Sequence, residues 1–264
     1  MMNDEEVILV NFWSSPFGCR VKIAMEEKGI PYKYIEEDLF NKSSFLSAIN
    51  PVHKKVPVLV HNHKPICESL NILEYVDEIW SDRSPRFLAS DPHQRAQARF
   101  WANFIDRELY EASQKIYIGK GEEQVVGKNE VLRILKLVEG ELGDKPFFGG
   151  DNLGLVDITL VPFYSRFYTW ETFGKFSIEE ECPGLMAWAK RGTSWYAMAN
   201  KRPNSGTRRD SGEFESRNPS RYAEGILEPL RGGLQELDHH PTIFSLQKPQ
   251  ELFKRTLVIP DHKR

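Results

Sequence analysis

The sequence predicts an α/β domain at the amino terminus, followed by a domain built from helices alone. Short apolar runs alternate with amphipathic helical patterns over residues 7–80. Over residues 92–191, apolar and aromatic side chains recur at helical spacing. Between these regions, residues 81–92 gather Pro, Ser and Asp, which is typical of a linker.

The first unit of the α/β domain is expected to be a strand, a helix and a second strand. Val7–Val10 is a continuous apolar run and predicts a buried strand. Val21–Gly29 predicts a helix that ends at a glycine cap, with Pro16 just inside the helix start. The aromatic and β-branched segment Tyr32–Ile35 predicts the next strand.

The second unit is expected to be two strands and a helix. Lys55–Val60 and Pro65–Cys67 predict strands joined by a hairpin turn at His61–Lys64. Ser69–Trp80 then carries apolar residues at helical spacing. A short helical or irregular segment, Lys42–Ala48, precedes this unit. The resulting βαβ-ββα order is that of a thioredoxin-like domain.

Helices are expected throughout the second domain. They are predicted over Pro92–Tyr117, Glu122–Leu142, Ile158–Tyr164 and Ser177–Arg191. Asp157 lies three residues after Gly154, which is the position of a capping carboxylate. Pro183 either splits the last helix or begins it. Core positions are expected for the aromatic residues Tyr164, Phe167, Tyr168 and Trp170.

The character of the sequence changes at Gly192. Residues 192–264 contain six Gly and six Pro, and twelve basic residues against nine acidic ones give this segment a charge of +3. Subtracting +3 from the total of −3 leaves −6 for residues 1–191. Such a composition predicts an atypical, largely disordered tail. The expected boundaries are residues 6–82 for the thioredoxin-like domain, 83–91 for the linker, 92–191 for the helical domain and 192–264 for the tail.

Composition excludes several classes of function. A net charge of −3 argues against a nucleic-acid partner. Cys19, Cys67 and Cys182 are too few and too scattered for a disulfide framework, which fits a reducing compartment. The acidic start, residues 1–6, is unlike a signal or transit peptide, and no apolar run approaches the ~18 residues of a membrane span. We therefore expect a cytosolic protein with no membrane partner.

The turn at Ser14-Ser15-Pro16 joins the first strand to the first helix. Unpaired backbone N–H groups and the helix dipole place partial positive charge there. That environment stabilises an anion, including a thiolate. Ser15 could donate a hydrogen bond to a substrate sulfur that docks at this turn, or it could be a simple helix cap.

Two later turns suit a small peptide ligand. Val56-Pro57 lies where thioredoxin-like folds carry a cis-proline, which would leave the Val56 backbone free to pair with an extended peptide. The alternative is an edge strand that tolerates proline. Glu68 suits an ammonium group, and Ser69 at a helix N-terminus suits a carboxylate, although this pair alone would be read as a plain helix cap.

Two lysines could complete such a site. Lys42 and Lys55 can supply positive charge for a second carboxylate, although surface lysines are usually only solvated. The histidine pairs His61/His63 and His239/His240 have no matching ligand at metal-binding spacing, so no metal site is expected.

Several motifs in order resemble those of a plant tau-class glutathione transferase. The segments that carry the resemblance are Ser15-Pro16-Phe17-Gly18, 50–59 (NPVHKKVPVL), Cys67-Glu68-Ser69, Gly149-Gly150-Asp151-Asn152, 95–101 (RAQARFW) and 187–191 (AWAKR). Together they cover about residues 6–191. The resemblance implies conjugation of glutathione to hydrophobic electrophiles, as in detoxification and stress responses, with a possible peroxidase side activity.

The resemblance also implies roles for residues. Glu68, Ser69, Val56 with Pro57, Lys42 and Lys55 would bind glutathione in order from its γ-glutamyl end to its glycyl carboxylate. Ser15 would be the catalytic hydroxyl that stabilises the thiolate, with Ser14 a weaker candidate. Glutathione would be a co-substrate, no cofactor would be needed, and two chains would form a homodimer or a heterodimer with a related chain.

The electrophile site is less well defined by the sequence. Phe17 and Tyr110 are its candidate residues, with Trp13 less favoured. Cys19 lies one residue too late for a Cys-x-x-Cys redox motif and is expected to be a small buried apolar residue, as is Cys67. A contact of Glu78 with Arg95 or Arg99 across the dimer is a further expectation.

The tail leaves two alternatives open. Family chains continue into one more helix, whereas residues from Gly192 onward have no match. Such a tail is what alternative splicing, a retained intron or an error in the gene structure would produce. The chain could then be a non-catalytic ligand carrier, or the inactive product of an aberrant transcript.

Overall fold

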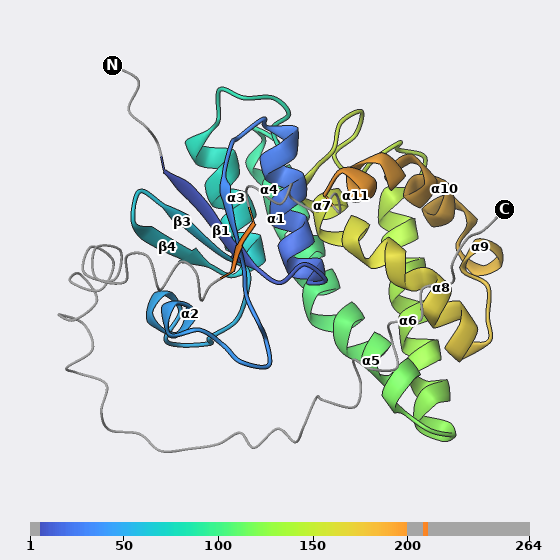
Figure 1. The fold of residues 1–264 in the computed structure, drawn as a ribbon. Coiled ribbons are helices and arrows are strands. Elements are labelled where there is room, and N and C mark those ends of the chain that lie inside the picture. The colour runs from blue at the N-terminus through green and yellow to red at the C-terminus, as the bar shows by residue number, and fades with distance from the viewer. Residues whose placement is uncertain (1–5, 200–207, 211–264) are drawn as a thin grey trace, which may run out of the picture.

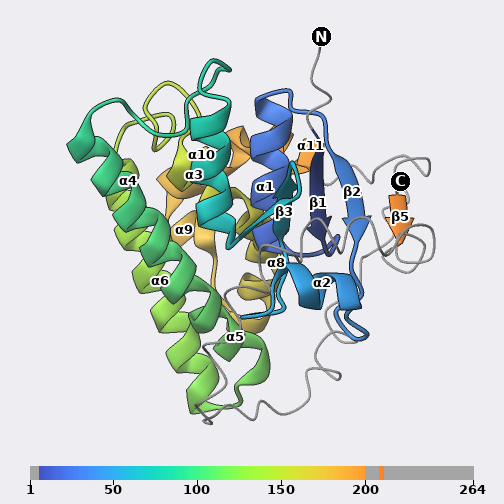
Figure 2. The ribbon, with the colours of Figure 1, turned by 90° about the vertical axis from the view of Figure 1, so that its left-hand side faces the viewer.

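A mixed sheet forms the centre of the amino-terminal domain. The computed structural model describes residues 6–199 and 208–210. The strands are β1 (Val7–Asn11), β2 (Lys33–Glu36), β3 (Val58–His61), β4 (Lys64–Cys67) and β5 (Arg208–Asp210). They lie in the order β4-β3-β1-β2-β5 (Figures 1 and 2). β1 and β2 are parallel, whereas β3 and β4 are antiparallel to their neighbours. The predicted βαβ-ββα order is therefore confirmed.

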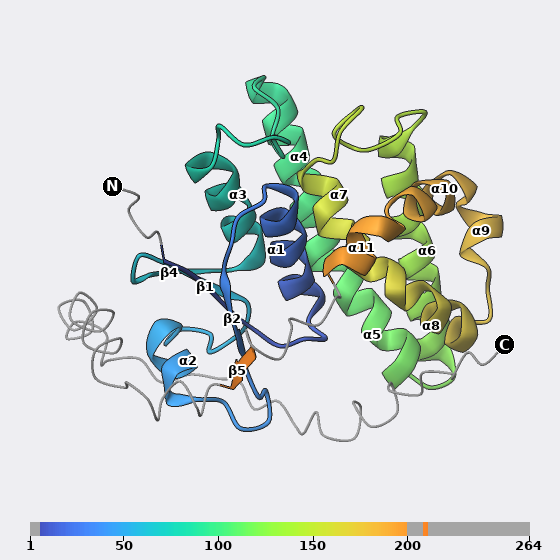
Figure 3. The same cartoon turned by 45° about the horizontal axis from the view of Figure 1, so that its top comes forward.

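Both faces of this sheet are covered because β1 alternates its side chains between two apolar clusters. Val7 and Leu9 join the large cluster beneath α1 (Pro16–Glu27) and α3 (Ser69–Ile79). Ile8 and Val10 join a smaller cluster beneath α2 (Ser44–Ile49) on the opposite face. Each buried aliphatic side chain contributes about 1.5–3 kcal/mol of transfer free energy. The sheet is thus fixed from both sides, and α1 lies between it and the helical domain (Figure 3).

The turns of this domain follow from local sequence. Ser15 caps α1, and Gly29 follows the helix with a φ of +58°, the left-handed conformation expected of a terminating glycine. The predicted hairpin turn is confirmed: Asn62 and His63 both have positive φ, as a two-residue hairpin turn requires. β3 begins at Val58, three residues later than expected, because the backbone at Lys55–Pro57 does not join the sheet.

The second domain is entirely helical. Its segments are α4 (Pro92–Phe104), a π-helical turn (Ile105–Leu109), α5 (Tyr110–Ile118), α6 (Glu122–Leu142), α7 (Leu155–Leu160), a 3₁₀ turn (Val161–Phe163), α8 (Tyr164–Gly174), α9 (Ile178–Glu181), α10 (Pro183–Arg191) and α11 (Thr193–Ala199). The predicted helix over 92–117 contains the π-helical turn, and Pro183 does split the predicted helix over 177–191. None of the helices described is long and apolar enough to cross a membrane.

Buried polar groups join the helices of this domain. The Asp157 carboxylate accepts hydrogen bonds from the backbone N–H groups of Phe148, Gly149 and Gly154 and from the Trp188 indole. The capping role expected of Asp157 is therefore confirmed, and the same side chain also ties a loop and α10 to α7. Of the aromatic residues expected in the core, Phe167 and Trp170 are buried, whereas Tyr168 is 71% exposed.

The linker is firmly held by a buried ion pair. Lys28 and Asp77 approach to 3.1 Å with side chains 0% and 1% exposed. The Asp77 carboxylate also accepts hydrogen bonds from the backbone N–H groups of Phe87 (2.9 Å) and Leu88 (3.3 Å). Lys28 donates to the carbonyl of Arg83 on the same linker. The segment between the domains is therefore packed rather than flexible.

The structure adds elements that the sequence analysis did not predict. Residues 164–174 form α8, and residues 193–199 form α11 inside the segment expected to be a disordered tail. α11 packs against α1, and Trp195 lies 5.0 Å from the Phe147 ring. Trp195 is an aromatic anchor of this helix, which is too short to show a periodic pattern. Apart from α11 and β5, the remaining tail residues, 200–207 and 211–264, lie outside the described part of the chain.

Candidate functional site

Strand register brings the predicted site residues to one edge of the sheet. Val10 of β1 pairs with Val58 at the start of β3, and Val58 pairs with Cys67 at the end of β4. On the other side, Asn11 pairs with Glu36 at the end of β2. The segments that follow β1, β2 and β4 and the segment that precedes β3 therefore meet at this edge. They carry Ser15, Lys42, Lys55, Val56, Pro57, Glu68 and Ser69.

Ser15 lies at this edge as the N-cap of α1. Its Oγ accepts a hydrogen bond from the Gly18 N–H at 3.2 Å, and the residue is only 9% exposed. A hydroxyl has one donor hydrogen besides its acceptor lone pairs. The cap uses a lone pair of Ser15 Oγ, so the O–H of Ser15 remains available as a donor. Among the described residues, this O–H has no acceptor. The capping and donating roles are therefore compatible.

The Val56–Pro57 peptide bond is cis, as the sequence predicts. Val56 precedes β3, and neither its N–H nor its C=O is hydrogen-bonded to any described residue. Backbone groups that lie beside a sheet without a ladder partner can pair with an extended peptide. Val56 thus offers one donor and one acceptor at the edge where Ser15 lies.

Glu68 and Ser69 form the turn between β4 and α3. Glu68 has a φ of +70°, which is uncommon for a residue with a side chain. Its side chain makes no capping hydrogen bond and is 58% exposed, with His53 Nε2 3.9 Å away. Ser69 is buried at the first position of α3. A carboxylate and a hydroxyl at a helix N-terminus therefore lie side by side.

Arg20 is a site residue that the sequence analysis missed. It is fully buried, and its Nη1 donates to Ser69 Oγ at 3.0 Å and to the Asp106 carboxylate. Its Nε donates to the backbone carbonyl of Thr159 at 3.0 Å. Because Ser69 accepts from Arg20, the Ser69 O–H can be donated to a ligand carboxylate. Asp106 lies 86 positions from Arg20, in the π-helical turn, and no local pattern connects the two.

Lys42 and Lys55 are both exposed on loops at this edge. The Lys42 Nζ donates to the backbone carbonyl of Lys54 at 2.9 Å, which joins the two loops. Ser43 donates its N–H and its hydroxyl to the buried Glu37 carboxylate, at 2.6 and 2.8 Å, and so fixes the loop that carries Lys42. Lys42 is therefore held against the loop that precedes Val56, and Lys55 is the residue next to Val56 in the chain.

The candidate electrophile residues also come together. The rings of Phe17 and Tyr110 lie 5.4 Å apart in an edge-to-face arrangement. Arg20 also contacts Phe17, with its guanidinium carbon 5.0 Å from the centroid of the Phe17 ring. Trp13 is 41% exposed nearby in sequence. An aromatic pair from α1 and α5 thus begins at Phe17, two residues after Ser15.

The surroundings of the chain's own cysteines raise the pKa values of their thiols. Burial raises the pKa of Cys19 to about 12 and that of Cys182 to about 11. Burial also raises the pKa of the half-buried Cys67. Burial therefore disfavours the thiolate form of all three cysteines. Among the described residues there is no cluster of three or more His, Cys, Asp or Glu that could hold a metal ion.

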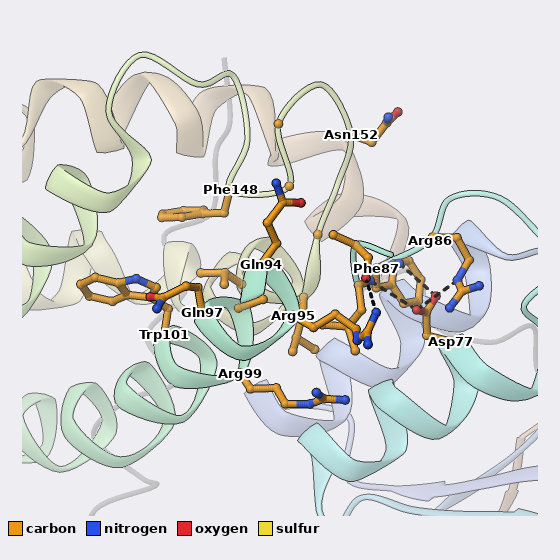
Figure 4. A pocket seen from close by; sticks show the side chains of 18 of the residues that line it. Asp77, Arg86, Phe87, Gln94, Arg95, Gln97, Arg99, Trp101, Phe148 and Asn152 are labelled. Carbon is orange, nitrogen blue, oxygen red and sulfur yellow. Dashed lines mark hydrogen bonds and ion pairs between the residues drawn. The ribbon is translucent and has the colours of Figure 1, made fainter. Parts of the chain in front are cut away.

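A cavity of about 970 Å³ lies elsewhere, around the first half of α4 (Figure 4). Trp101 and Phe148 lie on one side of this helix, and Arg95 and Arg99 lie on the other. None of the residues at the sheet edge lines it. Arg99 forms an ion pair with Glu74 of the same chain at 2.7 Å, which raises its pKa.

Comparisons with known proteins agree with this geometry. The family model for the glutathione S-transferase N-terminal domain matches residues 5–78, and that for the C-terminal domain matches residues 92–191. The probable glutathione S-transferase parC of Nicotiana tabacum is 54% identical over 77% of this chain and 92% of its own. Glutathione S-transferase U22 of Arabidopsis thaliana is 57% identical over 71% of this chain and 85% of its own.

Solved structures show the same fold. Rice GST1, crystallised in complex with glutathione, superposes with a TM-score of 0.71 at 38% identity, over 90% of this chain and 100% of that chain. The tau-class glutathione S-transferase from mango superposes with a TM-score of 0.67 at 41% identity, over 70% of this chain and 87% of that chain. The motifs, the fold and these relatives agree, and the chain belongs to the tau class of the plant glutathione S-transferase family.

Proposed function

We propose that this protein conjugates glutathione to hydrophobic electrophiles, and that Ser15 stabilises the reacting thiolate. The observation that carries the proposal is the geometry of Ser15: its Oγ accepts from Gly18 and so keeps its hydrogen for a ligand. A free thiol has a pKa of about 8.5, so little thiolate exists near neutral pH. A hydroxyl donor and a helix N-terminus both favour the charged form.

The thiolate would then attack an electrophilic carbon, and the leaving group would depart with the bonding electrons. Ser15 is not the nucleophile in this scheme, since its hydroxyl only donates to the sulfur. A peroxidase side activity follows from the same chemistry, because the thiolate can attack a hydroperoxide oxygen instead. Glutathione is a co-substrate here, and the mechanism uses no cofactor.

Glutathione would lie along the sheet edge from α3 towards the Lys42 loop. Glu68 would bind its ammonium group and Ser69 its γ-glutamyl carboxylate, since one acceptor and one donor adjoin at this turn. The Val56 backbone, next to Pro57, would pair with the peptide in the middle of the ligand. Lys42 and Lys55 would attract the glycyl carboxylate.

The electrophile would bind against Phe17 and Tyr110, whose rings adjoin the Ser15 turn. This aromatic surface suits an apolar substrate but does not select one particular electrophile. We propose that the protein acts in the cytosol, in detoxification and stress responses, as its class implies. The carrier and the aberrant-product alternatives are disfavoured by an intact Ser15 turn and by α11, which continues the helical domain past Arg191.

One experiment separates these alternatives. The full chain is bound to immobilised glutathione, and its conjugation of chloro-dinitrobenzene is followed by absorbance. We expect both retention and turnover. Retention without turnover would establish the carrier, and absence of both would establish an inactive product.

Lys42 and Lys55 should contribute to binding of the glycyl carboxylate of glutathione and of no other group. Replacing Lys42 and Lys55 together by Met should raise the KM for glutathione about 10-fold, with little change in kcat, because the charge pairs bind substrate and transition state alike. The control substrate is γ-glutamylcysteine, which lacks the glycyl carboxylate. Its KM should be nearly the same for both proteins. An equal penalty for the two thiols would contradict the assignment.

We also propose that two copies associate through α3 and α4. Phe100 is 59% exposed, and its ring stacks at 6.5 Å on Phe104 of the same helix. An exposed aromatic surface of this kind marks an interface. Glu78 on α3 and Arg95 on α4 line the cavity beside α4 with opposite charges, which suits a two-fold contact in which each chain presents both.

Phe100→Asp should convert the dimer into a monomer, because it places a charge in the centre of the apolar contact. Light scattering coupled to gel filtration would measure the mass. Tyr168→Asp is the matched control, since Tyr168 is a more exposed aromatic residue on α8. A monomeric wild-type protein, or dissociation by both variants, would refute this interface.

A further inference from the structure

The side chain of Asn11 lies directly against Gly18 in the first turn of α1. Asn11 is the last residue of β1 and is 1% exposed. A Cβ atom added to Gly18 would lie 1.8 Å from Asn11 Oδ1 and 2.3 Å from its Nδ2. Real Cβ atoms do not approach other atoms so closely. The Asn11 amide therefore occupies the space that any side chain at residue 18 would need.

Gly18 is also the residue that holds the Ser15 hydroxyl. Its N–H donates to Ser15 Oγ at 3.2 Å, and the next N–H, of Cys19, donates to the Ser15 carbonyl at 2.9 Å. The position of Ser15 Oγ is thus set by the backbone at residue 18. Whatever fixes Gly18 also fixes the hydroxyl.

The backbone of Asn11 is held in place by the central sheet. Its carbonyl accepts a hydrogen bond from the Glu37 N–H at 2.8 Å, and its neighbour Val10 pairs with Val58 of β3. The side chain points to the same face of the sheet as Leu9, which is the face covered by α1. An amide held on a central strand can therefore act as a fixed stop for the helix above it.

Neither polar atom of the buried Asn11 amide makes a hydrogen bond of ordinary geometry within the described residues, and the amide interacts with the Tyr34 side chain instead. Within the described residues, the only other buried side-chain atom without such a hydrogen bond is Nη2 of Arg20, on α1. Unpaired buried polar atoms are rare in folded proteins and call for an explanation. The Asn11 amide is therefore held mainly by packing, and the first turn of α1 at Gly18 is the backbone against which it packs.

We propose that Asn11 is a positioning residue for the reaction: its amide packs on the Gly18 backbone and so holds the first turn of α1, which holds the Ser15 hydroxyl in reach of the thiol. This inference rests on the proposed role of Ser15. It explains the glycine in Ser15-Pro16-Phe17-Gly18 as a consequence of Asn11 rather than of backbone conformation, since Gly18 does not have a positive φ. Glycine is required because the amide leaves no room.

A double-mutant cycle tests the coupling between the two residues. The variants are Gly18→Ala, Asn11→Gly and the combination of both. The readout is the pKa of the thiol of enzyme-bound glutathione, from the ultraviolet absorbance of the thiolate as pH is varied. Gly18→Ala alone should raise this pKa by about one unit, which is a tenfold fall in the acid dissociation constant of the thiol. In the Asn11→Gly background, adding Gly18→Ala should have little effect.

Two controls complete this experiment. Asn11→Leu keeps the branched shape and should retain a thiol pKa near that of the wild type, because the packing remains. Gly140→Ala changes a glycine with open space around it and should leave the thiol pKa unchanged. Circular dichroism and retention on immobilised glutathione verify that each variant is folded. If Gly18→Ala prevents folding, folding becomes the measured quantity of the same cycle. The double variant with Asn11→Gly should then fold again.

The outcomes distinguish this inference from the proposed function. An equal rise in the thiol pKa on Gly18→Ala in both backgrounds, or no rise in either, would overturn the role of Asn11 while leaving Ser15 in place. If Ser15→Ala leaves the thiol pKa unchanged, the role of Ser15 is wrong and the positioning role falls with it. A rise that disappears in the Asn11→Gly background supports the proposal.

Discussion

Replacing Ser15 by Ala should lower kcat/KM for glutathione conjugation about 10- to 100-fold near neutral pH. A hydrogen bond to a charged group contributes about 1.5–3 kcal/mol, which corresponds to about 1–2 pKa units of the bound thiol. The loss should shrink as the pH rises, because at high pH the thiol ionises without help. A pH profile of kcat/KM measures both effects. Retention on immobilised glutathione should persist, since Glu68, Ser69 and Val56 remain.

Ser14→Ala is the matched control for this experiment. Ser14 is the adjacent hydroxyl in the same turn, but only Ser15 accepts from Gly18 and caps α1. The control should therefore retain nearly full activity. A Ser14→Ala variant that loses more activity than Ser15→Ala, or a loss that is constant at all pH values, would refute the assignment.

Replacing Asp77 by Ala should lower the free energy of unfolding by about 3–5 kcal/mol. The substitution leaves the Lys28 ammonium buried without its partner, and removing one partner of a buried ion pair typically costs this much. It also removes the acceptor for the N–H groups of Phe87 and Leu88. For a chain of this size, the thermal midpoint should fall by roughly 10 °C. Calorimetry would measure it.

Arg86→Ala provides the comparison for Asp77. Arg86 pairs with the same carboxylate at 3.2 Å, but its side chain is 50% exposed, so its loss should cost less than about 1 kcal/mol. Lys28→Met should be intermediate, because Asp77 keeps its two backbone donors and Arg86. Similar midpoints for Asp77→Ala and Arg86→Ala would show that the linker is not held by this ion pair.

Much of the site could be predicted because its signals are local. The cis bond at Val56–Pro57, the capping position of Ser15 and the turn at Glu68-Ser69 each depend on two or three adjacent residues. The strand order then follows from the βαβ-ββα sequence of elements. Local patterns of this kind persist whatever the rest of the chain does.

Arg20 and Asp106 could not be predicted, because their meaning comes from a contact between residues 86 positions apart. From the sequence, Arg20 is one more basic residue on a surface helix. In the structure it is fully buried between the two domains. α11 was missed for a different reason, since seven residues are too few for a periodic pattern and the helix packs on distant elements, with Trp195 against Phe147.

The sequence by itself determined the βαβ-ββα elements of the first domain, the turn residues at the sheet edge and the family to which the protein belongs, because each is encoded over short stretches. Only the tertiary structure decided how the turns are supported. Asn11 is a polar residue at the end of an apolar strand in the sequence, and Gly18 is a helix-start glycine. Their contact exists because α1 folds back onto β1. The spacing of Asn11 and Gly18 in the sequence does not predict that these two residues meet.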